Sequence, residues 1–190
     1  TADVTVASLH PLCALPDPVG LTLAEVTAPL SGALMALDGD APAVTFAGEL
    51  AASMAGRPLV VEAHARAAYH AAAALAGNDG LALWALAIEA CVQAGLPEAE
   101  LRAGLLHLAG TSLTAVRRLP PEAPLVRGLT GAVARGDADT LARHLAALPE
   151  PARELHRRLS LVLVELVTPT GALSAERLAD LRERLDDGQD

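Results

Sequence analysis

The chain has 190 residues, 52% of them hydrophobic and 19% charged, so it is long and apolar enough to build a sizeable core. Its net charge is −9 and it has no basic stripe or aromatic stacking platform, which argues against binding to nucleic acid or to an anionic membrane. The two cysteines, Cys13 and Cys91, have no metal-type or redox-type spacing, and no signal peptide is visible. The apolar runs at 81–88 and 159–167 are too short to span a bilayer. We therefore expect a reduced, cytoplasmic protein.

The first third of the chain is typical of part of an α/β sheet. Strands are predicted, in chain order, over 3–9, 33–40 and 57–63. Residues 13–31 are rich in proline and glycine and predict a loop. A helix is expected over 44–55, with Asp40 as a suitable N-cap. The order strand, helix, strand favours parallel pairing with a right-handed crossover.

From Glu62 onward the pattern is helical. Helices are predicted over 62–94, with a bend near 77–80, and then over 97–119, 138–148, 149–167 and 174–186. Asp137 and Ser174 are the expected N-caps of two of these helices. The expected fold class is mainly α: a remnant βαβ portion of a Rossmann-type sheet (1–62) followed by an all-helical domain (63–190). Two or three strands and one helix do not make a stable sheet layer alone. We therefore expect additional strands, either upstream in the protein or from a partner.

The segment RAAYHAAAALAGND, from Arg66 to Asp79, places polar residues among the smallest apolar ones. Helical spacing puts Arg66 and His70 near one face with Ala73, Ala74 and Gly77, and Asn78 at its edge. One interpretation is helix packing, with His70 a buried imidazole whose hydrogen bonds are satisfied. The other is that His70 exchanges a proton and Asn78 orients a polar ligand group. Tyr69 lies about 100° round the helix, so we do not expect it to face the same small site.

Two further residues are candidates for a ligand-binding cleft. His10 ends a strand before a proline, where it either caps loop carbonyls or lies at the carboxyl end of the sheet. Arg135, in the segment TGAVARGD, could pair with a carboxylate or a phosphate. The other histidines show no metal-ligand spacing, so no metal site is predicted. There is no G-x-G-x-x-G after a strand and no G-x-S-x-G.

Four segments, within about residues 4–167, resemble motifs of a bacterial family of Rossmann-like oxidoreductases with a helical C-terminal domain. They are His10-Pro11-Leu12; Asp38-Gly39-Asp40; Arg66 with Tyr69-His70 and Asn78; and Gly131 with Arg135-Gly136-Asp137, Thr140, His144 and Leu145. The chain departs from the family pattern at Gly77, where serine is preferred, and at Ala132, where proline is preferred. Cys13 and Leu15 also replace the polar and aromatic residues expected there.

The resemblance implies an enzyme related to 6-phosphogluconate, ketopantoate and pyrroline-carboxylate reductases. In the intact protein a Rossmann domain would bind NAD(P), and a 6-phosphogluconate dehydrogenase C-terminal-like helical domain would form a homodimer and close over the nicotinamide. This chain would supply the substrate side, with His70 and Asn78 as catalytic residues and His10, Arg66 and Arg135 in the cleft. Alone it is expected to bind no cofactor and to be inactive.

Two alternatives remain open from the sequence: a non-catalytic helical interaction module, and a binding module for a small anion that uses Arg135 and the region of His10. The sequence identifies neither the substrate nor the choice between NAD and NADP.

Overall fold

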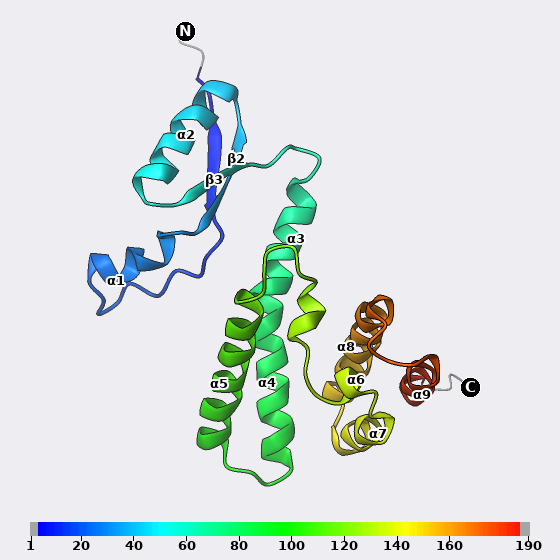
Figure 1. Ribbon diagram of the computed structural model, residues 1–190. Coiled ribbons are helices and arrows are strands. Elements are labelled where there is room, and N and C mark those ends of the chain that lie inside the picture. Colours follow the sequence, from blue (N-terminus) through cyan, green and yellow to red (C-terminus); the bar gives the residue numbers. More distant parts are fainter. Residues whose placement is uncertain (1–3, 187–190) are drawn as a thin grey trace. The chain divides into compact units, whose positions relative to one another are not determined.

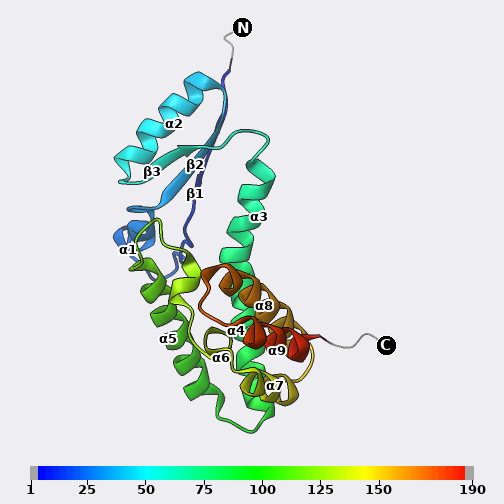
Figure 2. The ribbon, with the colours of Figure 1, turned by 45° about the vertical axis from the view of Figure 1, so that its right-hand side comes forward.

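The computed structural model describes residues 4–186, which divide into two compact units between Leu81 and Ala82 (Figures 1 and 2). The predicted fold class is confirmed: the chain is mainly helical, with a small three-stranded sheet followed by helices. The division falls inside helix α4 (Asn78–Gln93), whereas the predicted domains meet at residues 62 and 63. Because the units are defined by compactness, the domain boundary stays a prediction.

The first unit is built on a sheet with the strand order β1 (Ala7–Pro11), β2 (Leu34–Gly39) and β3 (Arg57–Val60). β2 and β3 are parallel, as predicted for a strand, helix, strand unit, and helix α2 (Ala41–Ser53) connects them. α2 contacts all three strands and covers one face of the sheet (Figure 1). The core of this layer consists of apolar side chains of β2 and small ones of α2: Met35, Ala36, Leu37, Ala47 and Ala51.

The segment 13–31, predicted as a loop, contains two short helices. They are α1 (Leu23–Thr27) and the 3₁₀ helix η1 (Ala28–Leu30). Thr22 and Glu25 form a capping box, in which each side chain accepts a hydrogen bond from the other residue's backbone N–H. The prediction was wrong here because the proline and glycine content outweighed this four-residue signal.

Asp40 directly precedes α2, but its side chain does not cap the helix. Its carboxylate instead accepts a hydrogen bond from the backbone N–H of Val6 at 2.9 Å. The helix begins at Ala41, three residues earlier than predicted, with a proline in its first turn. Asp40 therefore links the residue before β1 to the end of β2.

The predicted long helix 62–94 is resolved into α3 (Arg66–Ala76) and α4 (Asn78–Gln93), with the expected break at Gly77. Taken through that break, the segment Arg66–Gln93 is apolar and long enough to cross a membrane by length and composition alone. The strongly apolar runs alone did not predict this, because alanines join them into a longer apolar segment. A single such helix is weak evidence for membrane insertion.

All the secondary-structure elements described in the second unit are helices. After α4 it contains α5 (Glu98–Arg117), η2 (Leu125–Gly128), α6 (Ala132–Arg135), α7 (Ala138–Ala147), α8 (Ala152–Val167), η3 (Thr168–Thr170) and α9 (Ala175–Leu185). Its buried apolar core lies among α6 to α9: Val133, Leu141, Val164, Val167, Leu178, Leu181 and Leu185. The predicted caps are confirmed, since Asp137 accepts from Thr140 N at 3.0 Å and Ser174 from Arg177 N at 3.3 Å.

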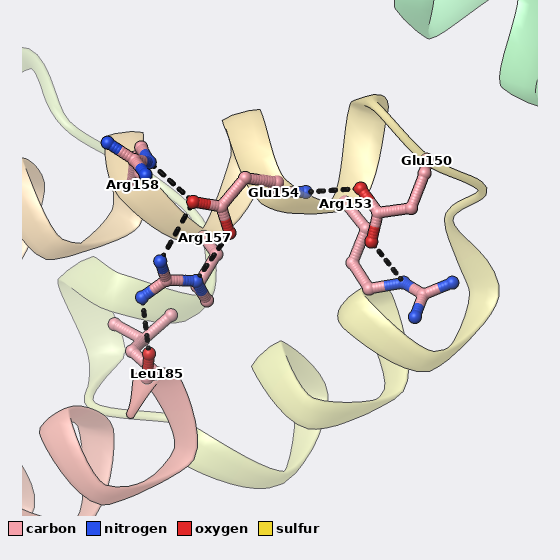
Figure 3. A network of polar contacts seen from close by, with 6 residues as sticks. All are labelled: Glu150, Arg153, Glu154, Arg157, Arg158 and Leu185. Atoms are coloured by element: carbon pink, nitrogen blue, oxygen red, sulfur yellow. Dashed lines mark hydrogen bonds and ion pairs between the residues drawn. The ribbon is translucent and has the colours of Figure 1, made fainter. Parts of the chain in front are cut away.

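A polar network joins α8 to the end of α9 (Figure 3). Arg157 donates to both carboxylate oxygens of Glu154, at 2.7 and 2.9 Å, and to the backbone carbonyl of Leu185 at 3.0 Å. Arg158 binds the same carboxylate. These hydrogen bonds, from Arg157 first and then Arg158, lower the pKa of Glu154 to about 2.

Candidate functional site

The first unit contains a cavity of about 480 Å³ beside the end of β1. One wall consists of residues 10–14, which include His10 and Cys13. The opposite wall comes from α3 and the residues that follow it: His70, Ala73, Ala74, Ala76, Gly77 and Asn78. This is the helix face predicted from the sequence, and its small side chains leave room for a ligand where larger ones would fill the space.

An ion pair fixes the start of α3 against the sheet. Arg66, the first residue of α3, pairs with Asp38 near the end of β2, and Asp38 lies opposite Ser8 of β1 in the sheet. One helical turn later, His70 reaches His10, two residues further along β1. α3 and the end of β1 thus bring their polar side chains together at the cavity.

Three rings form a cluster at the cavity wall. The Nδ1 atom of His10 lies 2.9 Å from the hydroxyl of Tyr69, within hydrogen-bond distance. The ring centroid of His10 is 5.7 Å from that of Tyr69 and 5.3 Å from that of His70. The rings of Tyr69 and His70 are 5.2 Å apart. Partial burial raises the pKa of the Tyr69 hydroxyl above its usual value, so this group stays protonated at neutral pH.

As expected for adjacent helix residues, Tyr69 and His70 do not both line the cavity, but His10 links their rings. Adjacent helix residues do point about 100° apart, but the imidazole of His10 is large enough to contact both rings. Tyr69 is not among the residues that line the cavity, so it contacts the site only through the two histidines. Tyr69 could have been identified from the sequence by its position next to His70, if His10 of the strand had been considered as a second aromatic ring nearby.

The other predicted site residues lie in different places. Arg66 is engaged with Asp38 and does not line the cavity. Arg135 belongs to the second unit, where its guanidinium is 4.0 Å from the carboxylate of Asp137. Cys13, which was not predicted as a site residue, is a partly exposed free thiol in the cavity wall.

The position of His10 has a different cause from the one considered in the sequence analysis. Ligands of parallel α/β sheets bind at the carboxyl ends of the strands. β1, however, is antiparallel to β2, and His10 lies opposite Ala36 in the first half of β2. His10 is therefore not at the carboxyl end of the neighbouring strand β2, and it is the packing of α3 that makes it part of a site.

The chemistry available in the cavity wall is that of two imidazoles, one carboxamide and one thiol. Imidazole exchanges protons near neutral pH, and the amide of Asn78 can donate to or accept from a polar ligand. No arginine, lysine or carboxylate lines this cavity. Among the described residues there is also no group of three or more histidine, cysteine, aspartate or glutamate side chains that could hold a metal ion.

Fold and site together describe a mixed three-stranded sheet with a histidine-lined cavity, followed by helices. Residues 33–162, more than half of the chain, match the family described as "Domain of unknown function (DUF2520)". The chain belongs to this family.

Among solved structures, the chain is similar to the crystal structure of protein TM1727 from Thermotoga maritima, with a TM-score of 0.66 and 24% sequence identity. The match covers 86% of this chain and 62% of that protein, so it spans less than two thirds of the relative's length. At this level of identity the likeness shows the fold alone. No curated protein matches the chain.

Proposed function

We propose that the chain supplies the substrate side of a cytoplasmic NAD(P)-dependent oxidoreductase, related to the 6-phosphogluconate, ketopantoate and pyrroline-carboxylate reductases. The observation that carries the proposal is the pair of imidazoles, His10 and His70, 5.3 Å apart at a cavity that Asn78 also lines. Three of the four motif resemblances contribute residues to this site or to the ion pair that positions α3. Two free cysteines are in keeping with a reducing compartment.

The proposed chemistry is the reduction or oxidation of a carbonyl-type carbon. The nicotinamide cofactor supplies or accepts the hydride. The chain's own residues would hold the substrate oxygen and move the accompanying proton. His70 makes no hydrogen bond within the described residues, which leaves its ring nitrogens available to exchange that proton. Asn78 would hold a polar substituent of the same substrate.

The pyrophosphate of the cofactor would be bound by a part of the protein other than the residues of this chain. The sequence has no G-x-G-x-x-G after a strand, and dinucleotide binding depends on the backbone approach which those glycines allow. Within the described residues both edge strands of the sheet have a free edge, because β1 and β3 each pair with β2 only. All four residues of β3 are exposed. Further strands of a nucleotide-binding sheet could add at such an edge.

The first test is calorimetric titration of the purified chain with NADPH. We expect at most weak binding. Micromolar affinity would contradict the proposal that another part of the protein binds the cofactor. If inorganic phosphate bound at micromolar concentration while NADPH did not, a module that binds small anions would be the better description.

The second test uses a protein in which the chain is joined to a dinucleotide-binding unit. His70→Ala should lower kcat by about 10²–10⁴-fold, the usual contribution of a general acid or base. His64→Ala is the matched control, because His64 is an exposed histidine of the same unit that does not line the cavity. Full turnover of the His70→Ala protein would rule out the proposed role.

A further inference from the structure

We propose that Tyr69 is a positioning residue: its hydroxyl donates a hydrogen bond to Nδ1 of His10 and thereby keeps the ring proton of His10 on Nε2. His10 then presents a fixed N–H donor to the cavity, which suits a ligand with an oxygen acceptor such as a carbonyl or carboxylate. The ligand role rests on the proposed function, whereas the hydrogen-bond geometry does not.

The direction of the hydrogen bond follows from the chemistry of the two groups. The oxygen and nitrogen are 2.9 Å apart, and neutral imidazole has one ring nitrogen that accepts and one that donates. A phenol, with a pKa of about 10, is a stronger donor than a neutral imidazole N–H, and an imidazole nitrogen is a stronger acceptor than a phenol oxygen. Partial burial raises the pKa of Tyr69 further, so the hydroxyl keeps its proton. This hydroxyl makes no other hydrogen bond among the described residues.

The consequence for the site is a division of roles between the two histidines. Tyr69 lies outside the cavity wall, and it occupies the Nδ1 side of His10. The ring nitrogen of His10 left for a ligand is therefore Nε2. His70 has no such partner and can take up or release a proton, while His10 binds the oxygen acceptor as a neutral donor.

The chain offers a direct test, because Tyr69 is its single tyrosine. In ¹⁵N NMR spectra of the histidine-labelled chain, at a pH where the histidines are neutral, His10 should show the well-separated ring-nitrogen shifts of the Nε2–H tautomer. Tyr69→Phe retains the ring and removes the donor, so it should move the His10 shifts toward the average of a tautomer mixture. The His70 shifts in the same spectra are the internal reference and should change little.

A second measurement detects the same hydrogen bond at the tyrosine hydroxyl. The Fermi doublet of tyrosine in the Raman spectrum reports whether a phenol donates or accepts, and here it arises from Tyr69 alone. It should indicate a donor in the unmodified chain and lose that character in His10→Ala, while His64→Ala leaves it unchanged. An Nδ1–H tautomer of His10, or spectra that are identical with and without the Tyr69 hydroxyl, would overturn the proposal.

The turnover assay separates this inference from the proposed function. If both hold, Tyr69→Phe should raise KM by about two- to tenfold, the worth of one hydrogen bond, with a smaller effect on kcat. An unchanged KM for Tyr69→Phe, beside a large loss for His70→Ala, would overturn the positioning role alone. Full activity of His70→Ala would overturn the proposed function and leave the tautomer result standing.

Discussion

Two pairs of histidine rings lie close together, one in each unit, and their surroundings differ. The pair His10 and His70 is exposed at a cavity. The pair His144 and His156, with ring centroids 5.7 Å apart, lies between α7 and α8, and the Nε2 atom of His156 is buried without a hydrogen-bond partner among the described residues. The first pair is accessible to a ligand, whereas the second pair is expected to affect the free energy of unfolding.

His156 should make the stability of the chain depend on pH. Burial, and then the neighbouring His144, lower its pKa in the folded state. The unfolded chain therefore takes up a proton first, near pH 6.5, and the free energy of unfolding falls as the pH drops below that value. His156→Leu removes this proton uptake, so the variant should gain stability relative to the unmodified chain between about pH 8 and about pH 5.

Urea unfolding at a series of pH values measures this difference. His64→Leu, at an exposed histidine of the first unit, controls for the loss of an imidazole as such. A difference between His156→Leu and the unmodified chain that does not vary with pH would show that His156 is not the group responsible.

At the scale of single residues, helical spacing was enough to predict that His70, Asn78 and the small residues between them share one surface. It was not enough to predict Tyr69, because the contact depends on the ring of His10, which lies 59 positions earlier in the chain. For the same reason Arg66 could not be assigned, because its partner Asp38 lies on strand β2, far from α3 in the sequence. Local sequence patterns predict which residues share one face of a helix or strand. Which faces contact each other depends on the tertiary structure.

Among the elements, the ion-pair network of α8 makes its own prediction. Glu154 is a far stronger acid in the folded chain, with a pKa of about 2, than in the unfolded chain, where a glutamate titrates near 4.3. A lowered carboxyl pKa contributes stability above the unfolded value, and that stability is lost as the pH falls toward the folded value. Glu154→Gln should therefore lower Tm at neutral pH, by an amount that shrinks between about pH 5 and about pH 2.

Thermal unfolding followed by circular dichroism tests this, with Glu49→Gln as the control. Glu49 lies on α2 and makes no ion pair among the described residues. If the decrease in Tm of Glu154→Gln stayed the same at acid pH, the carboxylate would not be the source of the stability.

The starts of two helices and the parallel pairing of β2 with β3 were predictable, whereas the direction of β1 was not. Asp137 and Ser174 are local capping signals, and both helices begin where the sequence indicates. The alternation in residues 7–11 fits either direction of pairing, and β1 is antiparallel because of the path taken by residues 12–33. That path includes α1, which starts at a capping box too short to stand out among prolines.

Considered as a whole molecule, the chain leaves much apolar surface uncovered. Neither α4 nor α5 has a buried residue, although both are rich in leucine and alanine. On α5, Leu106, Gly110 and Leu113 recur at helical spacing, and the two leucines are 43% and 59% exposed. A Cβ atom at Gly110 would meet nothing within 4 Å. Such a face permits the close approach of another helix.

We propose that a second copy of the chain covers this face, which belongs to the helical part predicted to form the homodimer. The partner is a second copy because the central part of this face, at Leu106, Gly110 and Leu113, is uncharged, and a two-fold axis can match it with itself. Light scattering at high micromolar concentration should give the mass of a dimer, and replacing Leu106 and Leu113 together by aspartate should give a monomer of unchanged helicity. Leu23→Asp, at an exposed leucine of α1, should leave the dimer intact. A monomeric mass for the unmodified chain would contradict the proposal.

The thiol in the cavity wall offers a way to search for the substrate without knowing its class. Cys13 lies beside the two histidines, and Cys91, on α4, can be replaced by serine. A library of small disulfides would then exchange with a single thiol, and mass spectrometry would reveal which fragments are retained because they also bind the surrounding wall. Fragments that carry a carbonyl or carboxylate near the tether should be enriched if His10 is the donor we infer. The residue that departs from the family pattern thus becomes the anchor for ligand discovery.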